Sequence, residues 1–281
     1  MPIYDQTYRR YEARGPLRQV RFWPITREAL RLILAKRAFL GLLGVALLPL
    51  VVRAVQIYVV TRVPEAGRIL PIDGRLFGEF LNQQIGFVLL LSVFGGAGLI
   101  ANDLRTGAIL IYLSRPLTRR DYVFGKLGVL LALNFGVTLG PALVLYGIGI
   151  AVAPEVFVRA DRAWIAPAIV LHSAVIAGVL GLVALAASSL SRSARIAGLG
   201  FFGLVAGLET ARGILGAMSH RPEAHVLSLQ HDLRMLGNAF FGIAERGVSV
   251  PTSYPALVLG LVCVACLAIL RARVRAVEVV R

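Results

Sequence analysis

The chain has 281 residues, of which 57% are hydrophobic and 16% charged, and its mean hydropathy is +0.76. A soluble domain of this size carries about 25% charged residues. The composition therefore argues against a soluble globular protein and favours an integral membrane protein. A net charge of +15 would suit a nucleic-acid-binding protein, but the basic residues gather on one side of the expected topology, and we expect no nucleic-acid partner.

The first 37 residues form a basic extension, with nine Lys or Arg before any long apolar run. Pro24, which follows an aromatic pair, is suited to the first turn of a helix. One face of that helix would be apolar and the other charged: Ile25, Ala29, Leu32 and Ile33 against Arg27, Glu28 and Arg31. This pattern predicts an amphipathic helix at the membrane interface.

Six apolar runs follow, each close to the ~20 residues that a bilayer requires. They lie at residues 38–61, 78–101, 125–153, 164–190, 195–218 and 252–271. The fold class is therefore an all-α integral membrane protein with six transmembrane helices. We expect one membrane domain over residues 38–271 and a basic tail at residues 272–281.

The connections between the runs differ strongly in charge. The side that receives both termini, residues 102–126 and residues 191–195 holds 20 Lys and Arg against 6 Asp and Glu. The other side, with the span ends that border it, holds 10 against 9, so the balance is 20 − 6 = +14 against 10 − 9 = +1. Because basic loops stay cytoplasmic, we expect both termini inside.

The connection at residues 102–126 reads NDLRTGAILIYLSRPLTRRDYVFGK and is too charged to cross a bilayer. Pro116 should end any helix begun at Thr106. Thr118, with Asp121 three residues later, should cap a second helix. We expect two short helices at a membrane face with their basic side chains in water, a shape that suits docking of a soluble partner.

The residue order of this segment resembles the cytoplasmic loop between the second and third spans of type-2 ABC-transporter permeases. That loop has an acidic residue, three residues, Gly, an apolar run, Ser-x-Pro, a small residue, two basic residues, an acidic residue, an aromatic and Gly-Lys. The matching positions are Asp103, Gly107, 109–113, Ser114, Pro116, Thr118, Arg119, Arg120, Asp121, Tyr122, Gly125 and Lys126. The sequence departs from the pattern at Asp103 (usually Glu), Ala108 (usually Thr) and Leu110 (often Glu).

The resemblance implies the membrane-spanning subunit of a bacterial exporter in the inner membrane, paired with a second permease chain and with a separate ATPase subunit. It implies an elbow helix near the N-terminus, a coupling-helix loop and short external helices before the last span. The residues implied to dock and couple the ATPase are Asp103, Gly107, Ser114, Arg115, Pro116, Arg119, Arg120, Tyr122 and Lys126. Spans two and five line the path in that family, which makes Asn82, Gln83, Gln84 and Glu209 the lining candidates.

Several polar residues lie inside the runs. Arg53 is far enough along the first run to reach the far interface and snorkel. Single polar residues within spans mostly bond to a neighbouring helix, and we expect this of Asn134, Thr138 and His172. Glu209 and Arg212, three residues apart in the fifth run, are well placed to neutralise each other.

Glycines in the fifth run allow two interpretations. Gly198, Gly200 and Gly203 spell G-x-G-x-x-G, but without a βαβ unit this is no dinucleotide site. Gly203 and Gly207 form a G-x-x-x-G face, which predicts close helix packing within the chain or with a partner.

Residues 219–251 form the largest external segment and carry an amphipathic helix signal. Its apolar stripe, expected to rest on the outer ends of the spans, comprises Val226, Leu229, Leu233, Leu236, Phe240 and Ile243. A metal is conceivable at His220, Glu223, His225, His231 and Asp232, but exposed positions on a polar face are the favoured interpretation. We expect no metal.

Catalytic motifs are not found in the sequence. Arg120 stands where a phosphate-binding loop ending in Gly125-Lys126 would need Gly. Cys263 and Cys266 lie inside an apolar run, where packing is favoured over redox chemistry. We expect no enzymatic activity and no cofactor in this chain. The alternatives are an ion-gradient secondary transporter, a non-transporting membrane scaffold and an intramembrane enzyme; the substrate is not indicated.

Overall fold

The computed structural model describes residues 22–63, 72–108, 118–157, 162–219, 228–243, 251 and 253–274. Over these residues the chain is helical and has no strand. The helices are α1 (Trp23–Leu34), α2 (Arg37–Ala46), α3 (Leu48–Arg62), α4 (Gly74–Gly96), α5 (Gly98–Thr106), α7 (Arg119–Val137), α8 (Leu139–Val152), α9 (Pro154–Phe157), α10 (Ile165–Leu190), α11 (Ala194–Ser219), α12 (Leu229–Phe240) and α13 (Ser253–Arg273).

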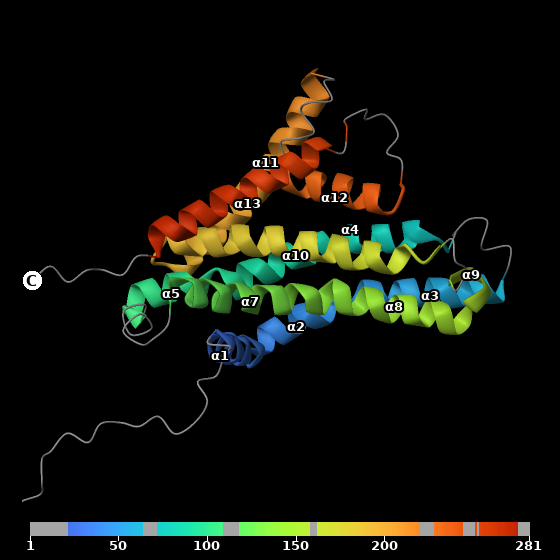
Figure 1. The fold of residues 1–281 in the computed structure, drawn as a ribbon, viewed down its shortest axis with the longest axis horizontal. Helices are drawn as coiled ribbons and strands as arrows, with labels where there is room; N and C mark the ends of the chain where they lie inside the picture. The colour runs from blue at the N-terminus through green and yellow to red at the C-terminus, as the bar shows by residue number, and fades with distance from the viewer. Residues whose placement is uncertain are drawn as a thin grey trace, which may run out of the picture.

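Six helical stretches in the described part of the chain are long and apolar enough to cross a membrane, which confirms the all-α, six-span fold class. They are Arg37–Arg62, Gly74–Thr106, Arg119–Val152, Ile165–Leu190, Ala194–Leu215 and Ser253–Arg273. We refer to them as spans one to six. Span four, formed by α10, packs against α4, α7, α11 and α13 and is the centre of the bundle (Figure 1).

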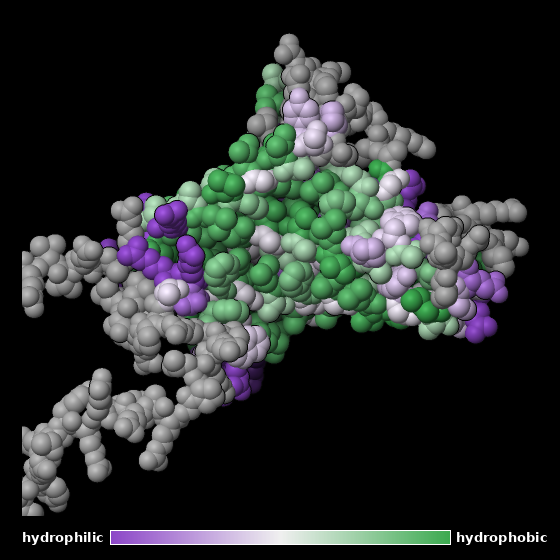
Figure 2. Space-filling view, in the orientation of Figure 1, coloured by the Kyte–Doolittle hydropathy of each residue, from purple (hydrophilic) through white to green (hydrophobic). Residues whose placement is uncertain are grey.

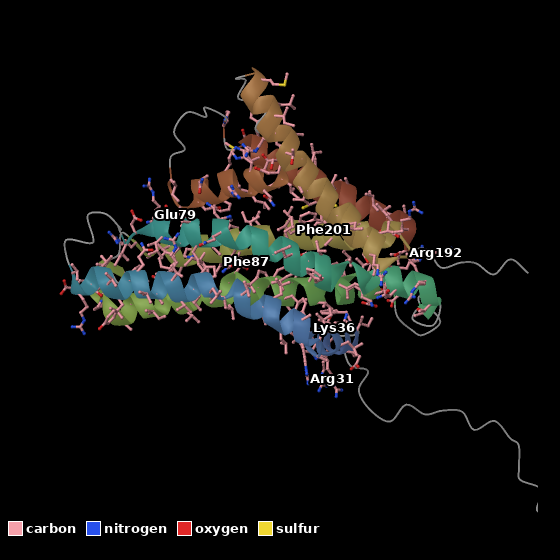
Figure 3. The ribbon with its side chains drawn as sticks, turned by 180° about the vertical axis from the view of Figure 1, so that it is seen from behind. Arg31, Lys36, Glu79, Phe87, Arg192 and Phe201 are labelled. Atoms are coloured by element: carbon pink, nitrogen blue, oxygen red, sulfur yellow. The ribbon has the colours of Figure 1, made fainter. Side chains whose placement is uncertain are left out.

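The bundle has an apolar belt between two more hydrophilic ends, as Figure 2 shows. Arg31, Lys36 and Arg192 lie toward one end and Glu79 toward the other (Figure 3). The ends of α5 and α13 and the start of α7 lie at the end that carries Arg192. The end of span two, the start of span three and the end of span six therefore lie at the same end of the bundle.

Helix α1 begins as expected, with Pro24 in its first turn, but its buried face differs from the predicted one. Ile25 and Ile33 are buried together with Thr26, whereas Leu32 is 61% exposed. The reason is that α1 packs on α7, and the contact stripe set by that neighbour includes the threonine and leaves Leu32 outside it.

Three spans are broken rather than straight. Span one breaks at Leu47, just before Pro49, and span three breaks at Thr138, shortly before Pro141. A proline removes a backbone donor and crowds the preceding turn, which explains both breaks. Span two breaks at Ala97, within the run Gly95 to Gly98, where glycines lower helix propensity.

Of the two short helices expected at residues 102–126, the first, between Thr106 and Pro116, lies largely outside the described residues, and the second begins at Thr118 as expected but is the start of a longer helix. Helix α5 carries span two on to Thr106, and α7 begins at Arg119 and continues into span three without interruption. Asp103 and Arg105 therefore lie in the last turns of α5, and Arg119 and Arg120 in the first turn of α7.

Helix α12 confirms the amphipathic helix in the segment before the last span. Leu229 and Leu233 are buried, and Leu236, Phe240 and Ile243 pack against the core. The helix contacts α4, α10, α11 and α13. Val226 and the candidates His220, Glu223 and His225 lie outside the described residues.

Candidate functional site

The candidate site is the connection between spans two and three, and both of its flanks have defined ends. Gly107 stops α5 with φ +72°, a left-handed conformation that glycine adopts without strain. Thr118 starts α7 with the predicted capping box: its Oγ1 accepts from the Asp121 N–H at 3.2 Å, and the Asp121 carboxylate accepts from the Thr118 N–H at 3.0 Å. Ser114, Arg115 and Pro116 lie outside the described residues.

Three of the predicted docking residues bind one another across the two flanks. Lys126 Nζ lies 2.7 Å from Asp103 Oδ2, and the Tyr122 hydroxyl donates to the same oxygen at 2.8 Å. Tyr122 is fully buried and Lys126 is 5% exposed. We call these three residues the clasp. A charged pair sharing its acceptor with a buried hydroxyl is a strong, directional link, so the clasp joins the end of span two to the start of span three.

Gly125, the glycine of the Gly-Lys pair, lies where α1 crosses α7. The Thr26 Oγ1 donates to the Gly125 carbonyl at 2.8 Å. A Cβ on Gly125 would lie 3.0 Å from the Ile25 Cβ and 3.2 Å from the Phe22 carbonyl oxygen, which is backbone. In the Gly125-Lys126 pair, the glycine therefore allows α1 to pack closely on α7, and the lysine forms the ion pair of the clasp.

Arg119 and Arg120, in contrast, are exposed at the first turn of α7. Within the described residues, no carboxylate forms an ion pair with either of them. Their neighbour Asp121 is occupied by the cap. Of the predicted docking residues that the structure describes, these two arginines are free to meet a soluble partner.

The break in span two is held by a serine from span four. The Ser188 hydroxyl donates to the Ala97 carbonyl at 2.8 Å and accepts from the N–H groups of Ile100 and Ala101 at 3.0 and 3.1 Å. Ser188 is buried. It thus satisfies backbone groups where α4 and α5 meet and fixes their relative direction.

The path-lining candidates bond to different helices. Asn82 donates to Asn238 of α12 at 2.9 Å, whereas buried Gln84 donates to the Ala46 carbonyl of α2 at 3.0 Å. Gln83 is exposed. Glu209 pairs with Arg212 at 2.6 Å, which confirms that pair, and it also accepts from Ser228 at the start of α12. Asn82 and Glu209 thus bond to α12 or its N-cap, whereas Gln84 bonds to α2.

The glycine face predicted on span five is open. No heavy atom outside its own stretch of helix lies within 4 Å of a Cβ built on Gly203 or Gly207. Close packing against span two occurs instead at Gly198, where a Cβ would lie 3.2 Å from the Ala97 Cβ. Gly203 and Gly207 therefore make no packing contact with the described part of their own chain.

Some contacts were not foreseen. Arg53 does not simply snorkel, because it pairs with Glu79 of α4 at 3.2 Å. Asn134 bonds to the Ala177 carbonyl of α10 at 3.4 Å as expected, but Thr138 bonds within its own helix, to the Asn134 carbonyl. The sequence could not predict these pairs, because no local spacing pattern links residues that are 26 positions apart, such as Arg53 and Glu79, or 156 positions apart, such as Asn82 and Asn238.

Two polar residues, His172 and Asp232, are fully buried where α10 meets α12. The His172 ring lies against Gly237 and the Leu233 backbone, so it contacts a neighbouring helix as expected. Asp232 was predicted on an exposed polar face but is fully buried, since α12 is covered by α10 and α13. Burial raises the pKa of Asp232 to about 7. No cluster of three potential metal ligands occurs among the described residues.

A comparison with models of protein families matches residues 24–269 to the ABC-2 family transporter protein. The matched region begins within α1 and ends within α13, so it includes spans one to five, most of span six and the segment between spans two and three. A search of curated proteins found no match.

Proposed function

The chain belongs to the ABC-2 family of transporter proteins, and on that premise we propose that it is the permease subunit of a bacterial exporter. In this proposal a separate ABC-type ATPase subunit hydrolyses ATP, and two permease chains in the inner membrane form the path. Both termini face the cytoplasm, as the charge difference of +14 against +1 indicates.

The observation that carries the proposal is the family match, which spans residues 24–269. The connection at residues 107–118 supports ATPase docking there, because its flanks expose Arg119 and Arg120 while the clasp ties the flanks to each other. Ser114, Arg115 and Pro116 belong to the same proposed docking segment. α1 lies at the position of the family's elbow helix. Because Thr26 of α1 bonds to the Gly125 carbonyl of α7, we expect α1 to move together with α7.

The mechanism follows from how the flanks are held. Closure of the ATPase dimer pushes the docking segment, and the clasp makes the ends of spans two and three move together. The push enters span two through α5 and reaches the break at Ala97, where Ser188 bonds both α4 and α5 backbone groups. A change of angle there alters the side of span two that faces the path between the two permeases.

The proposal is tested by reversing the two free cations. Arg119→Glu with Arg120→Glu places two negative charges at the docking surface, and juxtaposed like charges cost several kcal/mol. We expect loss of most co-purification with the cognate ATPase and loss of transporter-stimulated ATP hydrolysis. The matched control is Arg192→Glu with Arg195→Glu, two exposed arginines, one between spans four and five and the other in the first turn of span five.

Membrane insertion should be unchanged in both double variants, which is checked by the yield of folded chain in the membrane fraction. If the Arg119 and Arg120 reversal keeps wild-type association and hydrolysis, the connection is an ordinary basic loop. The ion-gradient secondary transporter would then be the better interpretation.

A further inference from the structure

A groove of about 480 Å³ opens between the start of α7 and the end of α13. Arg119 and Arg120 line it from α7, and Arg271 lines it from α13. Arg119 is the first residue of span three and Arg273 the last of span six, so the groove lies where two spans leave the apolar belt. Figure 2 shows hydrophilic residues gathered at that end of the bundle, next to the belt.

The groove is cationic at its rim and apolar along its length. Phe124 and Leu127 lie five and eight residues past Arg119, which is about 7 and 12 Å deeper along α7. Leu267 lies one turn deeper than Arg271 on α13. Phe124 is 58% exposed and Leu267 is 50% exposed, so both face the surroundings of the bundle, whereas Leu270 closes the groove from inside at 1% exposure.

The three arginines have no anionic partner in the described part of the chain: no ion pair joins Arg119, Arg120 or Arg271 to a carboxylate. An occupant that matches the groove must therefore carry negative charge at one end and apolar groups at the other. A soluble acidic segment would meet the arginines but would leave Phe124 and Leu267 uncovered at the depth of the bilayer.

The geometry points to a binding site for an anionic phospholipid, with its phosphate between Arg119, Arg120 and Arg271 and an acyl chain along Phe124 and Leu267. Arginine guanidinium groups form charge-assisted, often bidentate hydrogen bonds with phosphate. Basic pockets between transmembrane helices at the membrane surface are suited to lipid headgroups. The site does not depend on docking of an ATPase, although it shares two arginines with the proposed docking surface.

The test measures lipid retention by the purified chain in native mass spectrometry, with equimolar dioleoyl phosphatidylglycerol and dioleoyl phosphatidylcholine. We expect the wild type to retain the anionic lipid in preference to the zwitterionic one. Arg271→Gln should weaken phosphatidylglycerol binding about tenfold, the loss expected for one charge-assisted contact. The matched control is Arg273→Gln, which changes an exposed arginine on the same helix that does not line the groove.

Glycerophosphoglycerol, the same headgroup without acyl chains, should not displace the lipid at equal concentration, because it lacks the part that covers Phe124. Equal retention of the two lipids by the wild type, or equal effects of Arg271→Gln and Arg273→Gln, would overturn the site. If Arg271→Gln leaves lipid binding unchanged and lowers ATPase co-purification, the groove belongs to the docking surface and the lipid site is wrong.

Discussion

Lys126 and Asp103 show why a buried ion pair depends on both of its partners. Their side chains are 7% and 16% exposed, and the Tyr122 hydroxyl shares the carboxylate. The desolvation cost of such a pair offsets much of its attraction, so the pair adds little net stability over an apolar substitute. Removing one partner, however, leaves a charge buried without compensation.

We therefore expect Lys126→Met to destabilise the chain by about 3–5 kcal/mol. Adding Asp103→Asn should recover most of the loss, because a neutral amide oxygen still accepts from Tyr122. The measurement is the thermal unfolding midpoint in detergent, with Arg105→Met, an exposed arginine of α5, as control. Equal effects of Lys126→Met and Arg105→Met would mean that the clasp carries no stability.

Asp232 gives the folded chain a pH dependence with a definite sign. Burial raises its pKa from the usual value of 3.8 to about 7, so the folded state holds this proton more tightly than the unfolded state. Stability is then greatest at low pH and falls as the pH rises toward about 7, by at most about 1.4 kcal/mol per pH unit.

Asp232→Asn should abolish that part of the pH dependence and stabilise the chain at pH 8. The thermal unfolding midpoint in detergent, compared at pH 6 and pH 8 for the wild type and the variant, checks it. The same fall between the two pH values in both proteins would show that other groups cause it.

The helices could be predicted from the sequence more completely than the contacts between them. Length and apolar content gave all six spans, and the Thr118 capping box was readable because it is local. The pairing of Asp103 with Lys126 and of Ser188 with Ala97 was not readable, since nothing in one sequence marks residues 23 or 91 positions apart as neighbours. The burial of Asp232 was missed because helical periodicity describes one partner face, whereas α12 is covered on several sides.

The break in span two predicts that the hydrogen bonds of Ser188 from span four stabilise the fold. Ser188→Ala removes three hydrogen bonds at the junction of α4 and α5 and leaves buried backbone groups unpaired. We expect a loss of about 1–3 kcal/mol, seen as a lower unfolding midpoint. Ser189→Ala is the matched control, because among the described residues that buried hydroxyl bonds within its own helix, to Ala186 at 2.7 Å. A smaller effect at Ser188 than at Ser189 would contradict a role for Ser188 at the break.

The surface of the whole molecule indicates where a second chain would bind. The spans differ in how much of their apolar stretch is buried inside the chain. The buried share is 67% in spans two and four but 22% in spans five and six. On α11, Phe201 and Val205 face the bundle and are buried, while Gly203 and Gly207 lie on the opposite, open face. A surface of small residues lets a helix backbone approach closely, so we propose this face as a contact between two permease chains.

Gly203→Leu with Gly207→Leu should then lower the dimer fraction without changing the stability of the single chain, because the open face makes no contact within 4 Å in the described structure. A loss of about 1.4 kcal/mol in association would raise the dissociation constant tenfold. Single-molecule photobleaching in lipid vesicles measures the dimer fraction, and Gly136→Leu, at an open glycine of α7, controls for added bulk in a span. A dimer fraction equal to that of the Gly136→Leu control would assign this face of span five to lipid and would contradict its proposed role as a contact between two permease chains.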